Sequence, residues 1–98
     1  MGQRIQIDTT TVVDRSAIFV TDRSLTGTDG EGFSSVADTD GVDTFPAKLA
    51  AELFEVDPAL DRVYVDQNSV VLTRDGGWVD DVLESTRGVI GDFFLFYG

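Results

Sequence analysis

The chain has 98 residues, of which 42% are hydrophobic, enough for one modest core and too many for a disordered segment. Eighteen acidic side chains face seven basic ones, which gives a net charge of -11. Such a charge excludes nucleic acid and anionic membranes as expected partners, because both require a basic surface. The sequence contains no Cys and no His, and therefore no thiolate or imidazole for a metal site or for nucleophilic catalysis.

The excess of Asp over Glu and the near absence of Lys predict a high-salt environment. Fourteen of the acids are Asp, and Lys48 stands alone beside six Arg. Molar salt shortens the Debye length to about 3 Å and removes most of the self-repulsion of such a surface. No apolar run approaches the roughly 20 residues of a membrane span, and no secretory hydrophobic region opens the chain. We therefore expect one soluble, halophilic, cytoplasmic domain over residues 1–98.

Two strands are expected in the first quarter of the chain. Arg4–Asp8 alternates polar and apolar residues, the period of a half-buried strand, and Ser16–Thr21 is apolar enough to be a central one. The intervening Thr9–Arg15 is predicted to be a polar connection, a loose hairpin. Residues 22–43 are rich in Gly and Asp and are predicted to be a surface loop, with Phe33–Ala37 as a short edge strand.

A helix and a hairpin follow. Apolar residues recur at helical spacing over Thr44–Val56, Thr44 is a suitable cap, and Asp57-Pro58 ends the helix because a residue before proline disfavours helical geometry. Arg62–Asp66 and Ser69–Thr73 are predicted strands around a tight turn.

A second helix is expected from about Trp78. Its buried face would be formed by apolar residues at helical spacing: Val79, Val82, Leu83, Thr86, Val89, Ile90 and Phe93. Trp78 itself is predicted to be a core residue against the end of the hairpin. The order ββαββα predicts an α+β fold, a two-layer sandwich with a mainly antiparallel sheet of four to five strands and two helices on one face.

The C-terminal run Phe93–Tyr97 has more bulky residues than one helix stripe can bury. One interpretation is that the chain leaves the helix there and packs these rings under the sheet. The other is an exposed apolar patch that binds a partner or a second copy. On the second interpretation Phe96 and Tyr97, beyond the end of the stripe, are the candidate partner-binding residues.

Two acidic groups are candidate sites. Asp38–Asp43 is similar to a calcium loop, but its Gly comes two places early and apolar residues, Val42 and Leu49, stand at ligand positions five and twelve. Asp80 and Glu84 share a helix face, opposite the apolar one, whereas the adjacent Asp81 points elsewhere. We expect both groups to be solvated surface, with no catalytic residue, no metal and no cofactor.

Six short motifs between Leu49 and Phe94 follow one another in a recognisable order. The first three are a Leu-Phe pair that ends a helix (Leu53-Phe54-Glu55-Val56), a proline break (Asp57-Pro58) and a strand with an aromatic residue (Arg62–Val65). The next three are the partner strand (Val70–Arg74), a Trp (Trp78) and an aromatic helix end (Phe93-Phe94). This order resembles the N-terminal domain of the Nfu, or NifU-like, iron–sulfur scaffold proteins. The preceding part fits in outline, through Ile5–Thr9, Thr11–Arg15 and Ser16–Phe19.

The sequence departs from that family in two places. The family's prolines and asparagines before the second strand are replaced by Val12, Val13, Asp14 and Arg15, and Ala47-Lys48 stands where the family has Ser-Pro. Any binding determinants in that loop are therefore not carried over. In the family, a separate C-terminal domain with a Cys-x-x-Cys pair binds the cluster. The 98 residues contain no cysteine, so we expect a stand-alone domain that does not bind the cluster itself.

Two functions remain open at this point. The resemblance implies a non-catalytic protein-interaction domain, accessory to iron–sulfur cluster assembly or delivery, whose partner is a cluster-assembly or client protein. The alternative is a small enzyme or metal-binding domain that uses carboxylates alone. The lack of His and Cys favours the interaction domain.

Overall fold

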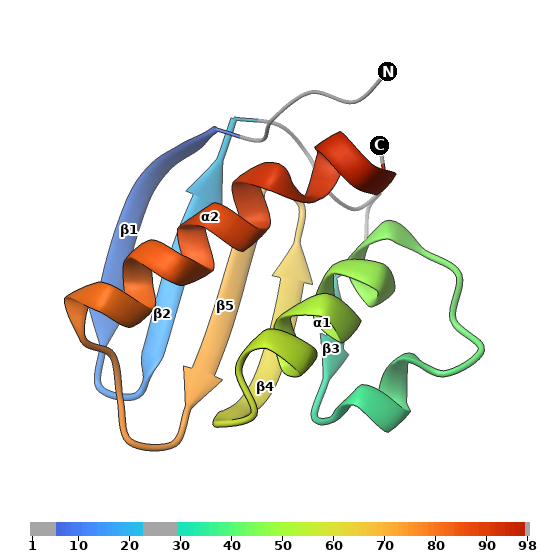
Figure 1. Cartoon of the computed structure of the whole chain (residues 1–98), viewed down its shortest axis with the longest axis horizontal. Coiled ribbons are helices and arrows are strands. Elements are labelled where there is room, and N and C mark those ends of the chain that lie inside the picture. Colours follow the sequence, from blue (N-terminus) through green and yellow to red (C-terminus); the bar gives the residue numbers. More distant parts are fainter. Residues whose placement is uncertain (1–5, 23–29, 98) are drawn as a thin grey trace.

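A computed structural model describes residues 6–22 and 30–97 of the chain, with only the backbone described for residues 94–97. Its five strands form one antiparallel sheet in the order β1-β2-β5-β4-β3: β1 Ile7–Val13, β2 Ser16–Thr21, β3 Glu31–Phe33, β4 Leu60–Asp66 and β5 Ser69–Arg74. The helices α1 (Phe45–Val56) and α2 (Asp80–Tyr97) lie side by side across one face of the sheet (Figure 1). The predicted α+β sandwich is confirmed.

The sheet buries its helix-facing side through alternation in its central strands. In β2, Ala17, Phe19 and Thr21 are buried, whereas the residues between them are partly exposed. The same alternation holds in β5 up to Leu72 and in β4 from Val63 on, after an irregularity in the pairing near its start. The resulting core is a single cluster of apolar side chains from both layers: Ala17, Phe19, Phe33, Ala47, Leu49, Ala50, Leu53, Leu60, Val63, Val65, Val70, Leu72, Ile90 and Phe93.

The first hairpin corrects the prediction for the start of the chain. β1 runs on through Val13, so Thr9–Val13 is a strand and not a polar connection. The antiparallel pairing of β1 with β2 continues as far as the pair Val13 and Ser16. A two-residue turn at Asp14-Arg15 joins the two strands, with Asp14 at a φ of 53°. β1 is an edge strand that is largely exposed along this stretch, so its sequence shows no alternation of polar and apolar residues. Its β-branched Thr and Val residues nevertheless favour strand conformation.

The first helix and second hairpin agree closely with prediction. The Thr44 side chain accepts a hydrogen bond from the Ala47 N–H at 3.3 Å, and the helix ends at Val56 before Asp57-Pro58. Arg74 in β5 donates from Nε to the Asp57 carboxylate at 2.8 Å and from Nη1 to the Gly77 carbonyl at 2.9 Å. This partly buried pair ties the end of α1 to the turn that leads into α2.

The segment before α1 contains less strand than predicted. β3 covers Glu31–Phe33, and a 3-10 helix, η1 (Val36–Thr39), takes the last two residues of the predicted edge strand Phe33–Ala37, of which only Phe33 is in a strand. A Cβ at Gly32 would lie 2.8 Å from Arg62 Nη2 and 3.2 Å from the Tyr64 ring, so both side chains of β4 pack closely against the backbone of β3.

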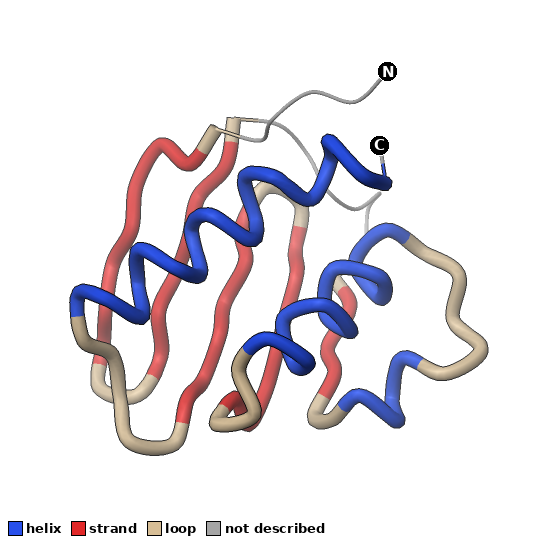
Figure 2. The backbone as a smooth tube through the Cα atoms, viewed as in Figure 1, coloured by secondary structure: helices blue, strands red, loops and turns tan. Residues whose placement is uncertain are grey.

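The second helix begins later than predicted, and its end contradicts one of the two interpretations of the aromatic run. It starts at Asp80, and Val79, expected on the buried face, has 61% of its surface exposed. The other end also differs, because the helix continues through Tyr97 and the chain does not leave it at the aromatic run (Figure 2). Over the described residues no helix is long and apolar enough to cross a membrane.

Candidate functional site

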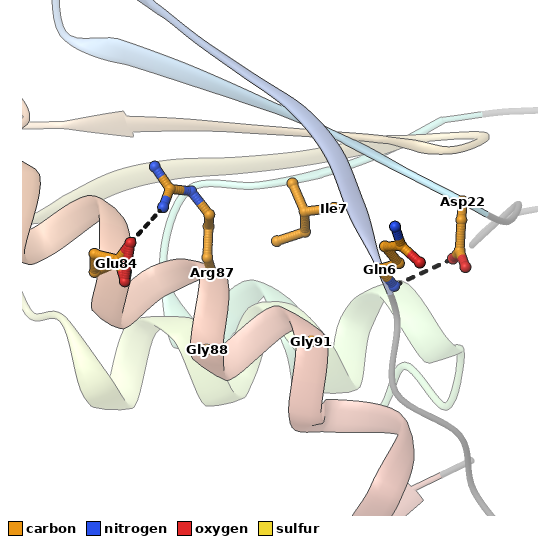
Figure 3. Close-up of a pocket in the computed structure, with 7 residues that line it drawn as sticks. All are labelled: Gln6, Ile7, Asp22, Glu84, Arg87, Gly88 and Gly91. Carbon is orange, nitrogen blue, oxygen red and sulfur yellow. Dashed lines mark hydrogen bonds and ion pairs between the residues drawn. The ribbon is translucent and has the colours of Figure 1, made fainter.

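A groove of about 540 Å³ lies between α2 and the ends of the first two strands. Gln6 and Ile7 line it from the start of β1, and Asp22 from the end of β2. The α2 side is formed by one face of the helix, as Figure 3 shows: Glu84, Arg87, Gly88 and Gly91.

Two glycines make the floor of this groove. Gly88 and Gly91 are three residues apart and so lie on one face of α2. Beyond the backbone of the helix, no described atom lies within 4 Å of the position that a Gly88 Cβ would occupy. Glycine inside a helix costs about 1 kcal/mol relative to alanine. Packing within the described chain therefore does not explain Gly88, which leaves helix backbone accessible from the groove.

The walls of the groove are polar and held in place by the fold. Arg87 donates from Nη1 to Glu84 at 2.8 Å and from Nε to the Thr10 hydroxyl of β1 at 3.2 Å. Across the groove, the Gln6 N–H donates to the Asp22 carboxylate at 3.2 Å, and the Asp22 N–H donates to the Gln6 carbonyl at 2.9 Å. The Arg87 guanidinium is thus held both by Glu84 of its own helix, α2, and by Thr10 of β1.

The described lining of the groove offers charged and polar groups. Its charged groups are two carboxylates and one guanidinium, and among the described lining residues there is no hydroxyl, thiol or imidazole. Half-buried helix backbone at Gly88 beside hydrogen-bonding groups can accommodate a polar chain or side chain of another molecule. Over residues 6–22 and 30–97, no three acidic side chains come together as a cation site.

A second hollow of about 480 Å³ lies at the opposite end of the molecule, between η1 and the end of α1. Its lining is more apolar and includes Val36, Phe54, Pro58 and Leu60. Val36 has 53% of its surface exposed. Its lining offers fewer groups that could fix the orientation of a ligand, so the groove beside α2 is the better candidate.

The acidic candidates from the sequence do not line the groove, apart from Glu84. The Asp38 carboxylate accepts a hydrogen bond from the Ser34 N–H at 2.7 Å, and Asp43 forms an ion pair with Lys48 at 3.4 Å. Asp80 and Asp81 are exposed in the first turn of α2, as expected for solvated helix surface.

Phe96 and Tyr97, the predicted partner-binding residues, belong to the last turn of α2. Their side chains lie outside the described part of the structure, so their role as contacts stays a prediction. The predicted core residue Trp78 is partly buried and packs against the core cluster from the segment before α2.

Sequence reasoning did not find the groove residues Gln6, Asp22, Arg87, Gly88 and Gly91. One signal was present, the two glycines Gly88 and Gly91 inside a helical pattern, where each costs about 1 kcal/mol relative to alanine. The contribution of Gln6 and Asp22 depends on the pairing of β1 with β2, which places the two residues together only in the folded sheet.

No protein-family model matches the sequence, and no curated protein matches it. Among solved structures, the fold is similar to the crystal structure of protein SAV1430 from Staphylococcus aureus, with a TM-score of 0.62. The similarity covers 86% of this chain and 96% of that chain, at 10% sequence identity. At that identity the comparison shows a shared fold.

Proposed function

We propose that this chain is a non-catalytic protein-interaction domain that assists iron–sulfur cluster assembly or delivery without binding the cluster itself. The groove beside α2 is the observation that supports an interaction role. It presents accessible helix backbone at Gly88 beside an Arg87 side chain that two other residues hold in place. The iron–sulfur part rests on the resemblance of the sequence to the Nfu N-terminal domain.

The proposed partner is a cluster-assembly or client protein in a salt-rich cytoplasm. Its contact with this chain would include the groove and the aromatic residues Phe96 and Tyr97 at the end of the same helix. Aromatic side chains often dominate the binding energy of protein interfaces. A binding role needs no catalytic group, which agrees with a sequence that contains neither His nor Cys.

The function is tested by deleting the gene in its native host. We expect lower activity of iron–sulfur enzymes such as cluster-dependent dehydratases, unchanged activity of cluster-free dehydrogenases, and restoration of activity by a plasmid copy. Unchanged activity of the cluster enzymes in the deletion strain would contradict the iron–sulfur role.

The contact surface is tested by the variants used for complementation. Gly88→Phe fills the groove, because its side chain enters open space. Val79→Phe places the same ring at an exposed position just before the helix and is the matched control. We expect the control to restore activity and the groove variant to fail, with both proteins equally stable. A separate truncation after Leu95 tests Phe96 and Tyr97, and full complementation by it would exclude them as contacts.

A further inference from the structure

Over the described residues, the outer edge of β1 pairs with no other strand. β1 is the last strand of the sheet on its side, and over the described residues it pairs with β2 alone. Figure 1 shows α2 crossing in front of the sheet, with no labelled strand beside β1 on its outer side. Such an edge presents unpaired N–H and C=O groups, to which an added strand can bind.

The hairpin geometry identifies the groups that face outward. Val13 and Ser16 flank a two-residue turn and therefore form a hydrogen-bonded pair. In an antiparallel ladder these pairs alternate, so Thr9 and Thr11 also bond to β2, whereas the N–H and C=O of Thr10 and Val12 point away from it. The Thr21 N–H donates to the Asn68 carbonyl at 2.8 Å, on the β5 side, which agrees with this alternation in β2.

This edge lacks the devices that usually block strand addition. Natural edge strands are protected by Lys, Pro, short length or bulges. Thr9–Val13 has five consecutive uncharged β-branched residues, and the single irregularity in its pairing lies before them, between Ile7 and Thr9. The opposite edge differs, because β3 has three residues and begins with an acidic one, Glu31.

The charges at the two ends of the edge indicate which kind of strand fits. Asp8 and Asp14 flank the uncharged stretch, both are exposed, and neither forms an ion pair within the described part of the chain. A second copy would bring two more carboxylates at its own β1 and a further net charge of -11. A strand with a Lys or Arg at each end would instead meet opposite charge at both ends.

We propose that the outer edge of β1 binds an extended segment of a partner protein as an added antiparallel strand. The segment has an uncharged, β-branched centre between two basic residues. Its backbone pairs with Thr10 and Val12, and its basic residues lie near Asp8 and Asp14. This inference deepens the proposed function and rests on it, since it names the surface and the class of partner segment.

The experiment measures binding of the synthetic peptide Lys-Thr-Val-Thr-Val-Thr-Lys, with Gly-Ser ends for solubility, to the purified chain. The salt is the lowest KCl concentration at which the chain stays folded. We expect bound peptide to slow amide exchange at Thr10 and Val12, with little change at Thr11, whose N–H already bonds to β2. A peptide with Glu in place of both Lys should bind at least about tenfold more weakly.

Two variants at one position isolate the outward N–H. Val12→Pro removes it without touching the β1–β2 ladder, and proline is tolerated on edge strands. Val12→Thr keeps the N–H and the branched shape. We expect about tenfold weaker peptide binding for the proline variant and unchanged binding for the threonine variant.

The following results would overturn the inference. They are an absence of protection at Thr10 and Val12 in the unaltered chain, equal binding by Val12→Pro, or equal binding of the Glu peptide. Concentration-dependent protection of the same amides without peptide would show that a second copy is the occupant. The outcome is separable from the proposed function, because failure to bind the peptide leaves the effect of gene deletion on cluster enzymes unaffected.

Discussion

Trp78 joins the second helix to the first hairpin, and its replacement gives the sharpest test of the packing described above. Its indole Nε1 donates to the Arg15 carbonyl at 2.9 Å, and its ring meets Phe19 edge to face with centroids 6.2 Å apart. The same carbonyl also accepts the Arg74 N–H at 2.9 Å. Removing the indole N–H therefore does not leave this acceptor without a partner.

The magnitudes follow from these contacts. Trp78→Phe keeps a ring near Phe19 and loses the hydrogen bond, which contributes about 0.5–1.5 kcal/mol. Trp78→Ala also loses the packing and the ring pair. Full burial would make that change cost about 3–5 kcal/mol, and since Trp78 is partly exposed we expect about 2–3 kcal/mol. In a domain of this size the alanine variant should melt roughly 8–24 °C lower.

The assay is denaturant and thermal unfolding followed by circular dichroism in molar KCl, because the variants lose the only tryptophan. Val79→Ala is the control, since Val79 is adjacent and 61% exposed, and it should change the free energy of unfolding by less than about 0.5 kcal/mol. Equal stability of Trp78→Ala and the unaltered chain would refute the assignment. Trp78 would then be an exposed contact residue.

Three further predictions concern salt, metal and the groove. The free energy of unfolding should rise between low and molar KCl because of the net charge of -11, and equal values would contradict the halophilic interpretation. Elemental analysis after gel filtration should find no stoichiometric iron, zinc or sulfide, and about one metal per chain would favour the carboxylate-site alternative. Gly88→Ala should stabilise the chain by about 1 kcal/mol, since its Cβ meets no described atom. Loss of stability in the Gly88 variant would mean that the groove floor is packed.

The elements that the sequence predicted well are those with strong local signals. β2 begins and ends as expected because its apolar run is central, and α1 is bounded by the Thr44 cap and the proline break. The second hairpin was also predicted. In the structure Asp66 pairs with Ser69 across a two-residue turn, in which Gln67 has a φ of 54°. In each case residues within a few positions of one another determine the local structure.

The missed features depend on partners far away in the sequence. Thr9–Val13 has no apolar alternation, and its strand conformation comes from pairing with β2 across the turn. The groove joins Gln6 to Gly88 and Gly91, which are more than eighty positions apart. Composition constrained the chemistry of such a site by excluding His and Cys, but it contained no information on where the site would form.

Arg87 connects the two surfaces proposed above. Its guanidinium lines the groove, and its Nε–H reaches Thr10, whose backbone faces the open edge of β1. A planar guanidinium can hold the Glu84 carboxylate and the Thr10 hydroxyl at the same time, which a single ammonium group does less well. The same residue therefore fixes the position of β1 against α2 and the polar wall of the groove. A partner segment added to β1 would extend the sheet beside this arginine, so the groove and the edge that we propose as contact surfaces are neighbours in the fold.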